Sequence, residues 1–305
     1  MTFLLPVGKA TITPAAPGTV LAKSEKDEYV GTDDHYTFRK GIGKLLHVGR
    51  FSRPEILSPV RDCAKHLSRP EPMDLESMMV IMKYCIRTPN RGLELKPNGI
   101  WDGDPEHEFV ITGFSDSDYA KCPDTRRSVM GLVVYLDGAP VAVGSNGMKS
   151  VALSVTEGEQ AAGVNCAQSM LHAMKVVEGM KLKVKKPMVL SLDNRGAFYL
   201  ANNWSTGGRT RHVECKQYFL RELKEQGILK VVWIPGATNV ADLFTKNLAG
   251  HDFRKHVRKL CGDDDYDEKN GDVDYDKSSM GGCRKVNLRT NARVGYSRYP
   301  EYEKQ

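Results

Sequence analysis

The sequence predicts an α/β domain built on a mixed β-sheet, with a small helical segment before it. Apolar runs rich in β-branched residues recur between residues 109 and 234, each about the length of one strand. Stretches with the period of amphipathic helices separate the later runs. The resulting order of three strands, helix, strand, helix, strand and helix is typical of an α/β protein whose sheet is mixed.

Composition sets broad limits on the class of protein. The chain has 305 residues, of which 40% are hydrophobic, so it can bury a sizeable core. Its net charge of +6 favours a polyanionic partner only weakly. The seven cysteines form neither a CxxC pair nor a zinc-ligand cluster, which is typical of reduced thiols. No apolar run approaches the roughly 18 residues of a membrane helix, and no signal peptide is recognisable. We therefore expect an intracellular protein, cytoplasmic or nuclear, without a membrane partner.

The N-terminal third differs in pattern from the rest. Residues 1–35 have little periodicity and are predicted to be a linker or the truncated edge of something larger. Residues 36–97 contain three apolar segments at helical spacing, which prolines punctuate. A polar stretch then leads to the α/β domain, predicted to span 108–261. From residue 262 to 305, acidic and basic runs follow one another without apolar periodicity, so a disordered charged tail is expected.

The first half of the α/β domain contains the expected hairpin and the longest helix. An apolar run at 109–114 predicts a strand that ends at Ser115 and Asp116, and runs at 132–136 and 141–143 predict a hairpin. The period changes after Thr156, which predicts a helix from there to about residue 179. Thr156 and Glu159 have the Thr-x-x-Glu spacing of a capping box, so Glu159 has a purely structural interpretation as well as a functional one.

The second half repeats the alternation of strand and helix. A strand is predicted at 188–192, directly before Asp193, and another at 228–234. Helices are predicted at 197–202 and 213–226, and a final helical stretch begins near Asn239 and includes Asp242.

This order brings four acidic residues to one edge of the sheet. Asp116 and Asp193 lie at the C-terminal ends of apolar strands, Glu159 lies in the first turn of a helix, and Asp242 opens the last helical stretch. Strand ends and helix starts meet at the same edge of such a sheet. Carboxylates gathered there repel one another unless a cation lies among them, and an all-oxygen ligand set favours Mg²⁺ or Mn²⁺ over zinc. Two such ions about 4 Å apart would suit in-line hydrolysis of a phosphodiester. The alternative is that Asp193 and Asp242 are ordinary turn or cap residues.

Five blocks of sequence together resemble the ribonuclease H domain of copia-type retrotransposon polyproteins. In chain order they are GFSDSDYAKCPDTRRSVMG (113–131), ALSVTEGEQAA (152–162), LSLDNRGAFYLANN (190–203), GGRTRHVECKQYFLRELKEQGIL (207–229) and WIPGATNVADLFTKNLAG (233–250). The order and spacing of five separate blocks make the resemblance specific. Residues 36–95 resemble, more weakly, the segment that joins the polymerase to the nuclease in the same polyproteins.

The resemblance implies a ribonuclease H-like fold, a five-stranded mixed sheet flanked by helices. It also implies cleavage of the RNA strand of an RNA–DNA hybrid, with two Mg²⁺ ions or Mn²⁺ as cofactor. The catalytic and metal-binding acids of that family correspond here to Asp116, Glu159, Asp193 and Asp242. Two neighbouring acids, Glu157 and Asp118, rank second. The implied partners are the RNA–DNA hybrid and other parts of the polyprotein.

Basic and polar residues near these blocks are candidates for contacts with the nucleic-acid backbone. Phosphate contacts supply affinity without reading sequence, which suits an enzyme that recognises the shape of a hybrid. An ordinary solvated surface is the alternative. The candidates are Arg126, Arg127, Asn194, Arg209, Arg211 and His212.

Departures from the family pattern leave a second hypothesis open. The chain lacks a Tyr-x-Asp-Asp polymerase motif, and Gly158 and Gln160 replace the Ala and the apolar residue expected beside Glu159. Gly in a helix costs about 1 kcal/mol relative to Ala. The hypotheses are a working hybrid-specific ribonuclease and an inert retroelement fragment that folds and binds nucleic acid without turnover. A transposase or integrase built on the same sheet is a third, weaker interpretation.

Overall fold

The computed structural model describes residues 13–23, 29–202 and 211–262, and in the last range it describes side chains from Tyr218 onward. Residues up to 264 form one compact unit. The predicted charged tail, 262–305, lies outside the described residues except for Gly262.

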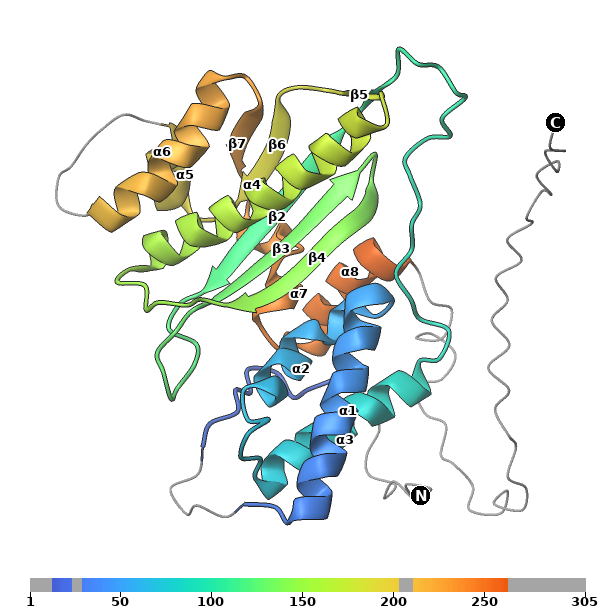
Figure 1. Cartoon of the computed structure of the whole chain (residues 1–305), viewed down its shortest axis with the longest axis vertical. Helices are drawn as coiled ribbons and strands as arrows, with labels where there is room; N and C mark the ends of the chain where they lie inside the picture. Colours follow the sequence, from blue (N-terminus) through green and yellow to red (C-terminus); the bar gives the residue numbers. More distant parts are fainter. Residues whose placement is uncertain (1–12, 24–28, 203–210, 263–305) are drawn as a thin grey trace, which may run out of the picture. The chain divides into compact units, whose positions relative to one another are not determined.

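Helices and strands follow the predicted order (Figure 1). The helices are α1 (Thr32–Phe51), α2 (Leu57–Ala64), α3 (Pro72–Arg87), α4 (Val155–Gly179), α5 (Arg195–Asn202), α6 (Arg211–Glu225), α7 (Asp242–Thr245) and α8 (Gly250–Cys261). Short 3₁₀ helices are η1 (Pro54–Ile56) and η2 (Gly236–Thr238). The strands are β1 (Glu108–Phe109), β2 (Ile111–Asp118), β3 (Val129–Leu136), β4 (Ala139–Gly147), β5 (Lys183–Val184), β6 (Met188–Leu192) and β7 (Leu229–Trp233).

The sheet confirms the predicted fold class. Its five strands lie in the order β4-β3-β2-β6-β7. The first three are antiparallel neighbours, whereas β6 runs parallel to both β2 and β7. A helical segment precedes this sheet, as expected. The strands β1 and β5 form a separate parallel pair.

The predicted first strand differs from the observed one in two ways. It is split, because Phe109 pairs with Val184 of β5 and β2 begins only at Ile111. It also continues past Asp116 to Asp118, because antiparallel pairing with β3 extends to the pair Asp118 and Val129. Asp116 therefore lies two residues before the end of the strand rather than at its end, and Asp118 is the last residue of that strand.

The two faces of the sheet bury different sets of helices (Figure 1). One core contains α4, α5 and α6, with residues such as Met170 and Leu220 packed on Val134 and Leu190 of the sheet. The other core contains α7, α8 and the N-terminal helices α1 to α3. Its sheet side chains are Val133 and Tyr135, and they lie in one cluster with Phe38, Tyr84, Phe244 and Phe253. The helical segment and the sheet therefore share a hydrophobic core.

The start of α4 corrects the predicted capping box. The N-cap is Ser154, whose hydroxyl accepts a hydrogen bond from the Glu157 backbone N–H at 3.1 Å. Glu157 returns the interaction, since its carboxylate accepts from the Leu153 N–H at 2.8 Å. The residues that cap the helix are thus Ser154 and Glu157 rather than Thr156 and Glu159, because the helix begins at Val155. Glu159 is left without a capping role.

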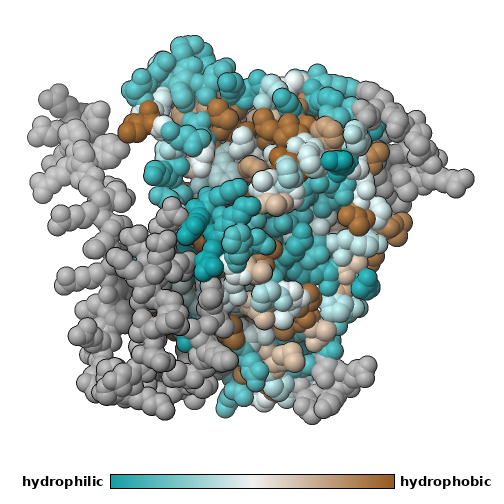
Figure 2. Space-filling model, turned by 180° about the vertical axis from the view of Figure 1, so that it is seen from behind, coloured by the Kyte–Doolittle hydropathy of each residue, from teal (hydrophilic) through white to brown (hydrophobic). Residues whose placement is uncertain are grey.

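The surface seen in Figure 2 is largely hydrophilic, with apolar residues in separate groups among polar ones. Among the helices that the structure describes, none has the length and hydropathy to cross a membrane.

Candidate metal centre

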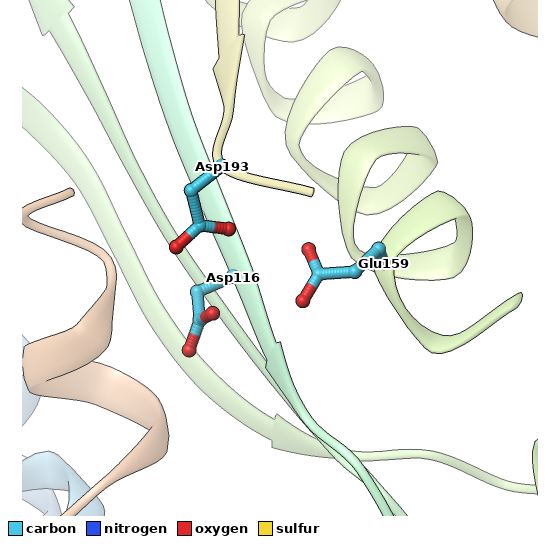
Figure 3. Close-up of side chains that lie close together, drawn as sticks. All are labelled: Asp116, Glu159 and Asp193. Atoms are coloured by element: carbon cyan, nitrogen blue, oxygen red, sulfur yellow. The ribbon is translucent and has the colours of Figure 1, made fainter. Parts of the chain in front are cut away.

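Three of the four predicted acids converge at one edge of the sheet (Figure 3). Asp116 comes from β2, Glu159 from the first turns of α4, and Asp193 from the residue that follows β6. Each offers one carboxylate oxygen, and these oxygens all lie within 4.8 Å of one another. Asp116 and Glu159 are buried, with exposed fractions of 2% and 3%, and Asp193 is half-buried.

The register between β2 and β6 explains why Asp116 and Asp193 lie side by side. Phe114 of β2 is the parallel partner of Ser191 in β6, so Asp116 and Asp193, each two residues further on, reach the same height. Both strands run toward this edge, which is where the carboxyl ends of neighbouring parallel strands meet. The site is therefore set by the pairing of β2 with β6.

Glu159 is held by one oxygen and leaves the other without a partner. Its Oε1 accepts hydrogen bonds from the Ser117 backbone N–H at 3.1 Å and the Ser117 hydroxyl at 3.0 Å. Its Oε2 is buried and has no hydrogen-bond partner among the described residues. Figure 3 shows this carboxyl group directed toward Asp116 and Asp193. A buried, unpaired carboxylate oxygen is unfavourable unless a cation or proton compensates it.

The pKa values of all three acids are raised, so a positive charge among them would be stabilising. Burial, followed by the charges of Asp116 and Asp193, raises the pKa of Glu159 to about 8. Burial also raises the pKa of Asp116 to about 6, although the ammonium of Lys246 opposes the rise. The pKa of Asp193 is raised as well, by burial and then by Asp116. Like charges crowded in a buried site favour protons, or a metal ion in their place.

Asp242, the fourth predicted acid, lies beside Asp116 but outside the group of three. It is half-buried at the start of α7, and its Oδ1 is 2.7 Å from the Nζ of Lys246. The same ammonium lies 3.4 Å from Oδ2 of Asp116. The Thr245 hydroxyl also donates to Oδ2 of Asp116. On the α7 side of the site, the ammonium of Lys246 therefore already offsets the negative charge of Asp116 and Asp242.

Close packing at Gly131 brings α7 to this position. Gly131 is the β3 partner of Asp116. A Cβ atom on Gly131 would lie 2.6 Å from the Ala241 carbonyl oxygen and 2.8 Å from the Thr245 methyl group. Only a residue without a side chain allows the helix to approach the sheet so closely. Thr245 and Lys246 reach Asp116 as a result.

Asn239 links the loop before α7 to the other acids. It is fully buried, its amide group donates to the Ser115 carbonyl at 2.9 Å, and the same amide lowers the pKa of the Asp193 carboxyl against the rise caused by burial. Its Oδ1 accepts from the Ala241 N–H at 3.1 Å. The Trp233 indole donates to the Asp193 carbonyl at 2.9 Å. These contacts orient Asp193 from both its backbone and its side chain.

Comparison with known proteins finds similar sequences among transposon polyproteins. No protein-family model matches it. The retrovirus-related Pol polyprotein from transposon RE1 of Arabidopsis thaliana is 28% identical over 254 residues, which cover 83% of this chain and 16% of that protein. The corresponding polyprotein from transposon TNT 1-94 of Nicotiana tabacum is 26% identical over 247 residues, or 80% of this chain and 18% of that protein. The chain is similar to retrovirus-related Pol polyproteins of transposons over most of its length. This confirms the resemblance predicted from the five sequence blocks.

The chain spans less than a fifth of the length of these relatives. Among solved structures, the N-terminal RNase H domain of a Mycobacterium tuberculosis protein is similar. It has 13% sequence identity and a TM-score of 0.34, over 50% of this chain and 98% of that chain.

The two lower-ranked acids have structural roles. Glu157 completes the cap of α4 through the Leu153 N–H. Asp118 forms an ion pair with Lys121 at 3.3 Å, and neither acid belongs to the group of three.

Of the six predicted nucleic-acid contacts, the structure describes the side chains of three: Arg126, Arg127 and Asn194. Arg126 and Arg127 are exposed on the loop between β2 and β3. Asn194 caps α5, because its Oδ1 accepts from the Ala197 N–H at 2.9 Å. Arg209 lies outside the described residues, and Arg211 and His212 begin α6, where only the backbone is described.

Sequence reasoning missed the residues that hold the acids: Ser117, Asn239, Thr245 and Lys246. A usable signal existed for two of them. Thr245 and Lys246 stand three and four residues after Asp242, which is the spacing of neighbours on one helix face. Ser117 and Asn239 lie on a strand and a loop, where spacing predicts no such contact.

The two departures beside Glu159 have different structural outcomes. A Cβ on Gly158 would lie 2.9 Å from the Ser117 hydroxyl, so glycine leaves room for the group that holds Glu159. Gln160 is 1% exposed, and both polar atoms of its side-chain amide lack hydrogen-bond partners among the described residues. The expected cost of Gln160 therefore has a structural basis, whereas Gly158 fits its position.

Proposed function

We propose that the chain is a divalent-metal-dependent nuclease that hydrolyses the RNA strand of RNA–DNA hybrids as one part of a transposon polyprotein. The observation that carries the proposal is the convergence of Asp116, Glu159 and Asp193, with a buried Glu159 oxygen that has no hydrogen-bond partner in the described part of the chain. The similarity to Pol polyproteins of transposons, together with the five sequence blocks that resemble a ribonuclease H domain, supports it.

The residues present fit a hard divalent cation. The three acids offer only oxygen ligands, which suit Mg²⁺ and Mn²⁺, and the unpaired Oε2 of Glu159 supplies a ligand position that no protein donor fills. When bound there, such an ion would activate a water molecule and offset charge on the phosphate. Asp116, Glu159 and Asp193 would hold it, and Asp242 would serve a second ion on the α7 side.

The chain's own residues perform the positioning. The Ser117 N–H and hydroxyl hold Glu159, the Thr245 hydroxyl holds Asp116, and the Asn239 amide holds Asp193. Each acid is thus oriented before substrate arrives, which reduces the reorganisation needed during reaction. Burial of Asp116 and Glu159 keeps them from bulk water and strengthens their interaction with a cation.

The substrate-binding part of the proposal rests on positive charge near the same edge. Arg126 and Arg127 are exposed on the loop that follows β2. This strand ends at Asp118, two residues after Asp116, so the loop begins close to the acids. Arg209, Arg211, His212 and Asn194 complete the proposed backbone contacts. Such contacts bind phosphates without reading sequence, so the affinity for hybrid should fall steeply with salt.

An inert fragment that binds nucleic acid without turnover remains the second candidate. The observation that favours it is Gln160, a buried amide without partners directly after Glu159. That residue lowers stability beside the site but removes none of the three acids.

Cleavage of an end-labelled RNA–DNA hybrid by the purified chain, in Mg²⁺ and in Mn²⁺, tests the proposal. Duplex DNA and duplex RNA serve as substrate controls. Asp193→Asn should abolish RNA-strand cleavage, and Asp252→Asn, a matched change at an exposed aspartate outside the site, should leave it intact. A folded protein that cleaves no hybrid in either metal would refute the nuclease and leave the inert fragment.

A further inference from the structure

Lys246 occupies the place between Asp116 and Asp242. Its ammonium is 2.7 Å from Oδ1 of Asp242 and 3.4 Å from Oδ2 of Asp116. The side chain of Asp116 is 3% exposed and that of Lys246 is 40% exposed, so the ion pair has one buried and one accessible partner. A lysine so placed is a bridge between two acids and not a solvated surface group.

The local backbone fixes this lysine in place. Lys246 is the C-cap of α7, and its N–H donates to the Asp242 carbonyl at 3.0 Å. Its neighbour Thr245 is fully buried and donates to Asp116. Gly131 allows this short helix to lie against the sheet. The position of the ammonium therefore follows from the packing of α7.

The two sides of the site differ in charge compensation. On the α7 side, Asp116 and Asp242 share the ammonium of Lys246. On the α4 side, the part of the chain that the structure describes contains no ion pair to Glu159 or Asp193, and Oε2 of Glu159 lacks a partner. A divalent ion would meet attraction on the α4 side and repulsion from an ammonium on the α7 side.

We infer that the ammonium of Lys246 takes the place of a metal ion between Asp116 and Asp242. The site then binds one divalent ion tightly, on Asp116, Glu159 and Asp193, and a second ion enters beside Asp242 only when Lys246 moves away. This inference rests on the proposed function, since it concerns the metal load of the same site. The sequence-based expectation is two ions, without a lysine that controls the second. Lys246 acts as a positioning residue that sets metal stoichiometry.

Titration of the full-length chain with Mn²⁺, followed by electron paramagnetic resonance and calorimetry, tests the inference without any activity measurement. The wild type should bind one Mn²⁺ tightly. Lys246→Met, which removes the charge but keeps the length, should bind a second Mn²⁺ about tenfold or more tightly than the wild type does, because one repulsive charge is gone. Lys246→Gln provides a second neutral variant should the methionine variant fail to fold.

Lys246→Arg and Lys183→Met are the controls. The first keeps the charge and should keep wild-type stoichiometry, and the second removes an exposed lysine that pairs with Glu106 away from the site. Two tight Mn²⁺ ions in the wild type, with no change in either neutral variant, would overturn the role of Lys246 while leaving the nuclease intact. Failure of every folded variant to bind Mn²⁺ would overturn the metal site itself, and the proposed function with it.

Discussion

At the scale of single residues, Glu159 combines burial, two hydrogen bonds from Ser117 and an oxygen without a partner. Its ordinary pKa of 4.5 rises to about 8 in the folded protein, chiefly through burial. The metal-free folded state therefore binds more protons than the unfolded state between these two values. Its contribution to stability is fully present below about pH 4.5 and is lost as pH rises toward 8.

This shift predicts that the metal-free protein becomes less stable between pH 5 and pH 8, and that Glu159→Gln removes much of that loss. Urea unfolding in the presence of a chelator, at several pH values in this range, measures it. Glu157→Gln is the matched control, since Glu157 caps the same helix and lies outside the group of three acids. An unchanged pH dependence in Glu159→Gln would show that Glu159 is not the group that titrates.

A substitution of Gln160 is predicted to stabilise the protein. Its buried amide lacks partners among the described residues, and leaving such a group unsatisfied costs about 1–3 kcal/mol. Gln160→Met, which keeps the side-chain length, should therefore raise the free energy of unfolding by about 1–2 kcal/mol. Chemical denaturation measures the change, with Gln226→Met as an exposed control. A loss of stability in Gln160→Met would mean that the amide has a partner, such as a bound water.

The acids of the site could be predicted from the sequence, whereas the residues that form hydrogen bonds or ion pairs with them could not. Asp116, Glu159 and Asp193 follow from strand ends, a helix start and the sequence resemblance. Ser117 and Asn239 contact acids 42 and 46 residues away in sequence, respectively, through pairing and packing that no local spacing contains. The cap of α4 was assigned two residues too late, because Ser154 and Thr156 both precede a glutamate at the same spacing and only the observed helix start separates them.

At the scale of secondary structure, α7 is a four-residue helix whose position depends on Gly131. Gly131→Ala would place a methyl group 2.6 Å from a backbone oxygen, so α7 must move away from the sheet. We expect a destabilisation of about 1–3 kcal/mol, which is typical of an overpacked core. Thr245 and Lys246 would also retreat from Asp116, so cleavage should fall by more than the loss of folded protein explains.

Thermal unfolding together with hybrid cleavage measures both effects of Gly131→Ala. Gly147→Ala is the control, because a Cβ there meets no atom within 4 Å. Equal behaviour of the two variants would contradict the packing argument.

Element order was predictable because each strand and helix has its own periodicity in the sequence. The end of β2 was not, since its polar residues Ser115 to Asp118 carry no strand signal and are extended only because β3 pairs with them. The pair of β1 and β5 was missed for the same reason. Its two strands have two residues each and lie about 75 positions apart in the sequence. Pairing between distant segments is a tertiary effect that local propensity does not contain.

At the scale of the whole compact unit, the helical segment and the sheet are joined by one buried cluster. Phe38 of α1 and Tyr84 of α3 belong to it, as do Val133 of β3, Phe244 of α7 and Phe253 of α8. The ring of Tyr84 contacts that of Phe253 edge to face, with centroids 6.0 Å apart. The predicted boundary between residues 97 and 108 therefore separates two stretches of sequence that share a core.

This shared core predicts that a cavity in α1 destabilises the sheet as well as the helices. Phe38 is fully buried, and Phe38→Ala should lower the free energy of unfolding by about 3–5 kcal/mol. Protection of β2 and β3 amides from hydrogen exchange should fall with it, because the two parts unfold together. Tyr36→Ala, a change at a 68% exposed position of the same helix, is the control and should alter neither quantity. Loss of protection confined to α1, α2 and α3 would instead mean that the sheet keeps its own core and that the boundary near residue 100 divides two independently stable domains.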